Sequence, residues 1–198
     1  LEHRGACGAD SATGDGAGIL IQIPHQFFQE QCKKTGIDLP EAGRYAVGNI
    51  FLPTGKDTRQ GQEIMERAIL TEGLELLGWR DVPVDNTTIG KTARSVEPVI
   101  KQVFVGAGPS VKDQLAFERR LYCVRKRSAW GVRRAGLNEN NESFYACSLS
   151  SKTLIYKGQL MAPQLESYYI DLQDPNMVSA LALAHSRYST NTFPSWGR

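Results

Sequence analysis

The residues best suited to chemistry in this chain lie near its end, directly after an apolar run. Arg187 is followed closely by Thr190 and Asn191. A guanidinium on a rigid element, with a hydroxyl and an amide nearby, can grip a small carboxylate through two parallel hydrogen bonds. This pattern points to an amino-acid substrate. An Arg that pairs with a surface carboxylate has the same local sequence, so the residue types alone leave both interpretations open.

A glycine-rich stretch, 5–18, is the second candidate. Closely spaced glycines let backbone N–H groups surround a phosphate, but here the stretch precedes a predicted strand and has the spacing GxGxG, without a following Gly-Lys-Ser/Thr. We therefore predict a structural turn or a loop that lines a site. Cys7 lies in this stretch with Arg4 nearby to lower its pKa, yet no His–Asp or His–Asn pair is recognisable as its base, and a small buried thiol is the commoner fate.

Three other polar side chains in these segments could take part in catalysis. His185 follows an apolar run, where a hydrogen-bonded core histidine is more common than a catalytic base. Asp10 and Asp15 could form a carboxylate pair, but in a glycine-rich loop such residues usually close Asx turns. We predict the structural role in each case.

The surrounding pattern indicates alternating strands and helices. Strands are predicted over 19–23, 45–52, 98–105 and 180–187, the last being apolar enough to suggest burial on both faces. Helices are predicted over 24–34, 57–77, 166–172 and from a capping box at Ser110 and Asp113 to about residue 134. The region 79–95 reads as a loop, and 143–150 with 153–157 as an antiparallel hairpin. This order favours an α+β fold with helices on a mostly antiparallel sheet.

Composition excludes several classes of protein. The 198 residues carry 23 basic and 21 acidic side chains, which gives no electrostatic footprint for nucleic acid or an anionic membrane. Basic clusters within 118–134 alternate with apolar residues, as on the wet face of an amphipathic helix. The four cysteines are scattered without zinc-ligand spacing, and no stretch is long and apolar enough for a membrane helix. We expect a cytoplasmic protein with free thiols, or a plastid protein if the source is a photosynthetic eukaryote.

Two segments together carry a family resemblance. His3-Arg-Gly-Ala-Cys-Gly-Ala-Asp10, with its continuation to Ile19, and His185-Ser-Arg-Tyr-Ser-Thr-Asn-Thr-Phe-Pro-Ser-Trp196 resemble the class II glutamine amidotransferase domain of the glutamate synthase large subunit. Other class II amidotransferases have shorter forms of both motifs. The resemblance covers essentially all of 1–198, which we interpret as a single, partial domain.

The resemblance implies a fold and a mechanism. The fold is an N-terminal-nucleophile hydrolase sandwich of four layers, αββα, with antiparallel sheets. An N-terminal Cys attacks the glutamine amide with its own α-amino group as base and forms a glutamyl thioester, whose oxyanion is held by an Asn side chain and a Gly N–H. By the same resemblance Arg187 holds the α-carboxylate of L-glutamine with Thr190 as second contact, while Arg4, His185, Tyr188 and Asn191 support the site.

The same resemblance sets expectations for the remainder of the protein. The nucleophile is expected upstream of Leu1 and the oxyanion motif after the Trp196 segment, so we expect 1–198 alone to be inactive. FMN and an iron–sulfur cluster belong to synthase domains elsewhere in the polypeptide, which use the ammonia to convert 2-oxoglutarate to glutamate. A small subunit that oxidises NADPH, or ferredoxin, is the expected electron partner. The alternatives are an amidophosphoribosyltransferase-like enzyme and a non-catalytic domain of the same fold.

Overall fold

The computed structural model describes residues 10–137, 144–186 and 194–197. The elements, in chain order, are β1 (Ala17–Gln22), α1 (His25–Lys34), β2 (Tyr45–Leu52), α2 (Asp57–Thr71), β3 (Glu75–Asp81), a 3₁₀ turn η2 (Asn86–Thr88), α3 (Lys91–Ser95), β4 (Val99–Gly106), α4 (Gln114–Arg134), β5 (Tyr145–Ala146), β6 (Thr153–Gly158), α5 (Gln164–Tyr168), a 3₁₀ turn η3 (Ile170–Gln173) and β7 (Ala182–His185).

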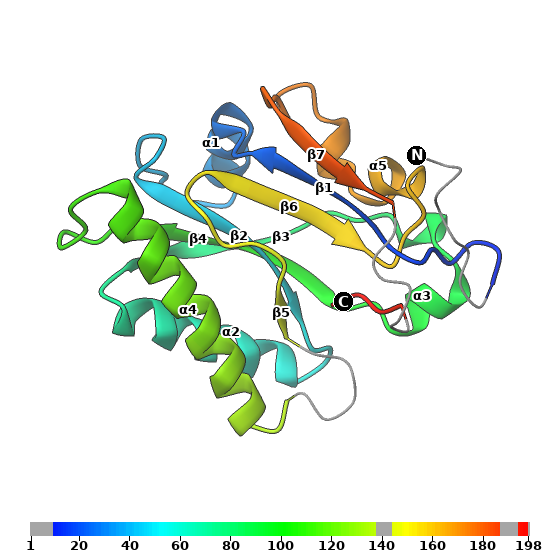
Figure 1. Cartoon of the computed structure of the whole chain (residues 1–198), viewed down its shortest axis with the longest axis horizontal. Helices are drawn as coiled ribbons and strands as arrows, with labels where there is room; N and C mark the ends of the chain where they lie inside the picture. The colour runs from blue at the N-terminus through cyan, green and yellow to red at the C-terminus, as the bar shows by residue number, and fades with distance from the viewer. Residues whose placement is uncertain (1–9, 138–143, 187–193, 198) are drawn as a thin grey trace.

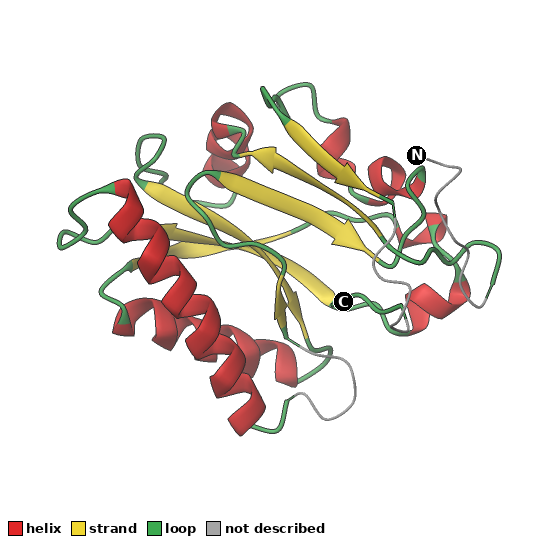
Figure 2. Cartoon of the chain, in the orientation of Figure 1, coloured by secondary structure: helices red, strands yellow, loops and turns green. Residues whose placement is uncertain are grey.

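The strands form two antiparallel sheets that stack on one another (Figure 1). One sheet has the order β6-β1-β7 and the other has the order β3-β4-β2-β5. The helices α2 and α4 lie side by side on the outer face of the four-stranded sheet (Figure 2). The layers are therefore helices, sheet and sheet, which confirms the predicted α+β sandwich with antiparallel sheets.

Two apolar cores follow from the period of two in the central strands. On β2, Val47 and Phe51 point between the sheets, whereas Ile50 and Leu52 point toward α2 and α4. All eight residues of β2 are buried, because both of its faces are covered. Phe28 of α1 joins the core between the sheets, where its ring packs edge-on against Phe104 at 5.3 Å.

The outer face of the three-stranded sheet is more exposed than its inner face. Leu20 pairs with Ile155 on one side and with Leu183 on the other, so these three side chains form a row across the sheet. Leu183 is 68% exposed. Within the described ranges we see three of the four expected layers, and no helix pair covers this row.

Several predicted elements need correction. The helix predicted over 166–172 is α5 followed by the separate 3₁₀ turn η3. The helix predicted over 57–77 ends at Thr71, and β3 follows. Its apolar spacing continues past Gly73, but that residue has φ +67° and turns the chain, which redirects Leu74 into the core below α2. The predicted loop over 79–95 therefore contains the end of β3 and all of α3. The helix α4 begins at Gln114, and Asp113, not Ser110, caps it by accepting from the Ala116 N–H at 2.7 Å.

The predicted hairpin over 143–157 is also wrong, since its two arms belong to different sheets. Ala146 of β5 pairs with Ile50 of β2, whereas β6 pairs with β1. The chain crosses between the sheets at 148–152. This crossing is fixed by Glu118 of α4, which accepts from the Ser151 N–H at 2.7 Å and from its hydroxyl at 2.6 Å.

Candidate functional site

The pairing of β1 with β7 brings the two motifs together. Gly18, at the end of the glycine-rich stretch, lies opposite His185 in the antiparallel register. A methyl group on Gly18 would come within 2.6 Å of His185 Nε2 and 2.8 Å of Lys157 Cβ. The imidazole therefore lies across Gly18, and only glycine leaves room for it. Segments more than 160 residues apart meet at this point, two residues before Arg187.

His185 is not the buried core residue that we predicted. All four residues of β7 are exposed. The reason is position in the sheet: β7 pairs with β1 alone and is an edge strand of the described sheet, so an apolar run does not by itself guarantee cover on both faces. The other predicted site residues, Arg187, Thr190, Arg4, Tyr188 and Asn191, lie outside the described residues, as does Cys7.

The described part of the glycine-rich stretch is a structural loop built around Asp10. Asp10 Oδ1 accepts from the Ala12 N–H at 3.1 Å, which closes the predicted Asx turn. Its Oδ2 accepts from the Thr13 hydroxyl at 2.8 Å and from the Thr92 N–H at 3.1 Å and hydroxyl at 2.7 Å. These bonds, led by the Thr92 hydroxyl, hold the pKa of Asp10 well below its ordinary value. A carboxylate engaged in this way is a poor general base.

Tight backbone contacts fix the same loop. A methyl group on Gly14 would lie 2.0 Å from the Leu160 carbonyl carbon, and one on Gly90 would lie 2.2 Å from Thr13 Oγ1. The Gly90 N–H donates to the Ala12 carbonyl at 3.0 Å. Gly14 and Gly90 therefore serve close packing of this loop against the chain before α3 and after β6.

Trp196 belongs to the second motif, and its side chain contacts the short helix α3. Its Nε1 donates to the Ala93 carbonyl at 2.9 Å, and its ring lies 5.8 Å from Phe51 and 5.5 Å from Tyr168. A side chain on Gly158 would meet this ring at 2.6 Å. Trp196 is 4% exposed. The helix α3 thus contacts both motifs, through Thr92 on one side and Ala93 on the other.

A buried polar network that we did not predict joins the two sheets near this site. Arg80 of β3 donates to both carboxylate oxygens of Asp171, at 2.7 and 2.8 Å, and to Gln102 at 2.7 Å. The Tyr156 hydroxyl donates to Asp171 at 3.0 Å and accepts from Gln102 at 3.0 Å. Burial acts to lower the pKa of Arg80, but the hydrogen bonds and charge of Asp171 outweigh it and raise this pKa. Because the partners come from separate elements, no local motif could have revealed the network.

The described cysteines do not form a reactive centre. Burial raises the pKa of the Cys32 thiol and of the Cys147 thiol to about 12 each. Cys123 is exposed on α4. In the described portion of the chain, no group of three or more His, Cys, Asp or Glu side chains could hold a metal ion, and no helix is long and apolar enough to span a membrane.

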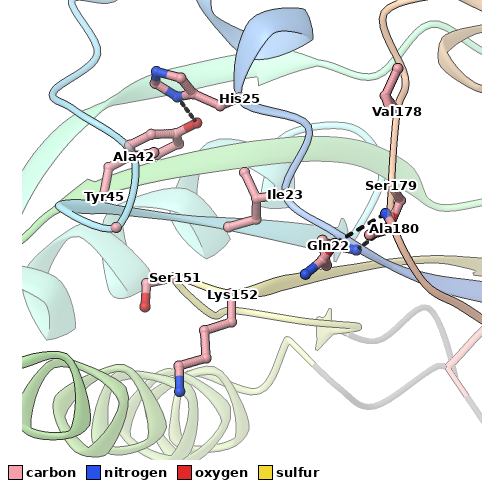
Figure 3. Close-up of a pocket in the computed structure, with 11 residues that line it drawn as sticks. Gln22, Ile23, His25, Ala42, Tyr45, Ser151, Lys152, Val178, Ser179 and Ala180 are labelled. Carbon is pink, nitrogen blue, oxygen red and sulfur yellow. Dashed lines mark hydrogen bonds between the residues drawn. The ribbon is translucent and has the colours of Figure 1, made fainter.

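A separate pocket of about 420 Å³ lies at the opposite end of β1 (Figure 3). Two of its polar side chains are bonded to protein partners: His25 Nδ1 lies 2.9 Å from the Tyr45 hydroxyl, and the Gln22 side-chain oxygen accepts from the Ala180 N–H at 3.1 Å. The Gln22 N–H donates to Ser179 at 2.9 Å. The pocket is thus distinct from the motif site.

Comparison with known proteins identifies the class. The family model of class II glutamine amidotransferases matches residues 1–198, and the chain belongs to this family. Three relatives that match the chain are all named glutamate synthases. The chain is 50% identical over its whole length to the glutamate synthase [NADPH] large chain of Bacillus subtilis. It is 42% identical over its whole length to glutamate synthase [NADH] of Schizosaccharomyces pombe, and 42% identical over 99% of its length to the chloroplastic/mitochondrial ferredoxin-dependent glutamate synthase 1 of Arabidopsis thaliana.

The chain corresponds to only a small part of these relatives. The matches cover 13% of the Bacillus protein, 9% of the Schizosaccharomyces protein and 12% of the Arabidopsis protein. The family resemblance recognised in the sequence is confirmed. Membership in the family also accounts for the fold, because two stacked antiparallel sheets are the centre of the four-layer αββα architecture that the resemblance implied.

Proposed function

We propose that this chain is part of the glutamine-hydrolysing domain of a glutamate synthase large chain. In that role it binds L-glutamine, whose side-chain amide is released as ammonia for the formation of L-glutamate from 2-oxoglutarate. The identity of 50% to the Bacillus large chain over the whole of 1–198 supports this assignment. It favours a glutamate synthase over the amidophosphoribosyltransferase alternative, because the relatives described above are all glutamate synthases.

The observation that carries the proposal is the register of β1 and β7. It sets Gly18 of the first motif against His185 of the second, and α3 connects the loop of Asp10 to Trp196. Two motifs that are remote in sequence therefore belong to one place in the fold. Such convergence is what a binding site for a small amino acid requires.

The roles of individual residues follow from the family motifs. Arg187 is proposed to hold the α-carboxylate of glutamine with Thr190 as second contact, and Arg4, His185, Tyr188 and Asn191 to support the site. The exposed His185 fits a supporting role better than a core role. The nucleophilic thiolate is not supplied by Cys32 or Cys147, since thiols with a pKa near 12 are almost wholly protonated at neutral pH.

Cofactors and partners are proposed for the rest of the polypeptide. FMN and an iron–sulfur cluster would serve the synthase reaction there; among the residues described, the three cysteines lie in separate elements and do not fit a cluster. The proposed electron partner is a small subunit that oxidises NADPH, or ferredoxin; NADH is a third possible donor, since relatives named for NADPH, NADH and ferredoxin all match the chain. We propose a cytoplasmic location, or a plastid one in a photosynthetic eukaryote.

The test is Arg187→Ala in the full-length enzyme. Loss of a two-bond carboxylate grip costs about 2–4 kcal/mol, which is about 30-fold or more in the KM for glutamine. Synthesis driven by added ammonia should persist, because ammonia bypasses the glutamine site. Arg119→Ala, an exposed residue of α4, is the matched control. An unchanged glutamine KM in Arg187→Ala would contradict the assignment, and absence of glutaminase activity in the unaltered enzyme would favour a non-catalytic domain.

A further inference from the structure

The short helix α3 forms hydrogen bonds with both motif segments. Its residues Lys91–Ser95 lie beside the glycine-rich loop and the Trp196 segment (Figure 1). We propose that α3 is a positioning element for the glutamine site, with Thr92 and Trp196 as its positioning residues. The proposal rests on the function proposed above and extends it from the proposed substrate contacts to residues that position them.

The contact with the first motif is made at the start of α3. Thr92 donates its N–H and its hydroxyl to one oxygen of Asp10, at 3.1 and 2.7 Å. Thr13, which is fully buried, accepts from the Ala93 N–H at 3.4 Å and donates to the same Asp10 oxygen. Charged hydrogen bonds of this kind are stronger and more directional than neutral ones. The loop therefore cannot shift without α3.

The contact with the second motif is made one residue later. The Ala93 carbonyl, which belongs to a fully buried residue, accepts from Trp196 Nε1 at 2.9 Å. The indole fills the space above Gly158 and between Phe51 and Tyr168, so it has one position. Trp196 fixes the chain nine residues after Arg187, and the pairing of His185 with Gly18 fixes it two residues before.

The consequence is that α3 helps to hold the two motifs in place relative to one another. Displacing it would move the Asp10 loop and the Trp196 anchor together, and a misplacement of about 1 Å in a positioned site costs on the order of 100-fold. Loss of one of several α3 contacts should cost less. We expect about 5- to 20-fold in the glutamine KM, with the ammonia-dependent rate nearly unchanged.

The experiment compares four variants of the full-length enzyme. Thr92→Val removes the hydroxyl donor, and Thr92→Ser restores it. Trp196→Phe keeps an aromatic ring but removes the Nε1 donor. Its matched control is Trp79→Phe, because Trp79 Nε1 donates to Glu66 at 3.0 Å between β3 and α2, outside the motif site. The glutamine KM, the glutamine kcat and the ammonia-dependent rate are measured for each.

The proposal expects a raised glutamine KM in Thr92→Val and Trp196→Phe, a KM near that of the unaltered enzyme in Thr92→Ser and Trp79→Phe, and ammonia-dependent rates within twofold throughout. The proposal is overturned if the glutamine KM rises in neither Thr92→Val nor Trp196→Phe. Equal losses of the glutamine and ammonia reactions also overturn it, because they show a general structural role. Arg187→Ala is assayed alongside. If Arg187→Ala raises the glutamine KM while Thr92→Val and Trp196→Phe do not, only this inference fails. If Arg187→Ala leaves the glutamine KM unchanged, the proposed function fails.

Discussion

At the scale of single residues, environment decides which polar groups are available for chemistry. Asp10 looks like a candidate base in the sequence, yet both of its oxygens accept hydrogen bonds in the fold. Burial keeps the Cys32 and Cys147 thiols protonated, so they are poor nucleophiles. The Asx turn at Asp10 was predictable, since its partner lies two residues away. The bonds from Thr92 were not, because that residue is 82 positions further along the chain.

The burial of the thiols predicts their reactivity. With a pKa of about 12, about one Cys32 or Cys147 thiol in ten thousand is ionised at pH 8, against about a quarter for a free cysteine. Iodoacetamide should modify Cys123 quickly and these two slowly, with all three modified in urea. Peptide mass spectrometry after timed labelling measures this. Rapid native labelling of Cys32 would show that the core between the sheets opens readily.

The lowered pKa of Asp10 predicts acid sensitivity. A carboxyl whose pKa is lower in the folded than in the unfolded chain contributes stability above its unfolded value of about 3.9, and this stability is lost as the pH falls toward the folded pKa. The free energy of unfolding should therefore decrease below about pH 4, and Asp10→Asn should reduce that slope. Urea unfolding at pH 6, 4 and 3 measures it. Asp38→Asn, at an exposed position, is the matched control, and an unchanged slope in Asp10→Asn would refute the role.

At the scale of elements, local sequence patterns predicted the bounds of some strands and helices. They did not predict which strands pair with one another. The strand 45–52 was predicted with its observed bounds, and the helix over 24–34 to within one residue. The segment 143–157 misled because two β-rich runs joined by two polar residues look like a hairpin whichever sheet each run joins. The helix α3 could not be predicted because it is too short for a periodic pattern and its stabilising partners are Asp10 and Trp196.

The network between the sheets predicts a large loss of stability from a single change. Arg80→Met leaves the carboxylate of Asp171, which is 3% exposed, without its cation, and breaking a buried pair costs about 3–5 kcal/mol. Urea unfolding followed by tryptophan fluorescence measures this change. Arg119→Met, on the exposed face of α4, should alter stability by less than about 0.5 kcal/mol. A cost below about 1 kcal/mol in Arg80→Met would mean that the network contributes little.

At the scale of the whole molecule, the apolar row on the three-stranded sheet ends in an exposed side chain at the edge of the described sheet. Leu183 lies on an edge strand of the described sheet, whose outer backbone groups can pair with another chain. The candidate site was predictable as two motifs but not as a place, because the contacts that join them, from the β1–β7 pairing and from α3, α5 and β6, link residues far apart in the sequence. The outward position of β7 was not predictable, since an apolar run has the same sequence at an edge as in a covered strand.

This surface predicts self-association of the chain when it is studied as residues 1–198. Leu183→Lys should reduce that association, because a charge on an edge strand opposes pairing with another strand. Leu115→Lys is the matched control, since Leu115 is 65% exposed but lies on α4, where no strand edge is present. Sedimentation velocity over a concentration series measures the effect. Equal behaviour of the two variants would show that hydrophobicity alone, and not the edge, drives association.

The topology of the three-stranded sheet also has a consequence for synthesis of the protein. The strand β1 is made early, but its neighbours β6 and β7 begin about 130 and 160 residues later. At a ribosomal rate of about 5–20 residues per second, β6 begins to be synthesised roughly 7 to 26 s after β1 is complete. During that interval Ile19-Leu-Ile21 has neither of its strand partners. Folding on the ribosome can therefore pair β2, β3 and β4 and pack α2 and α4 on them before β1 meets either of its strand partners.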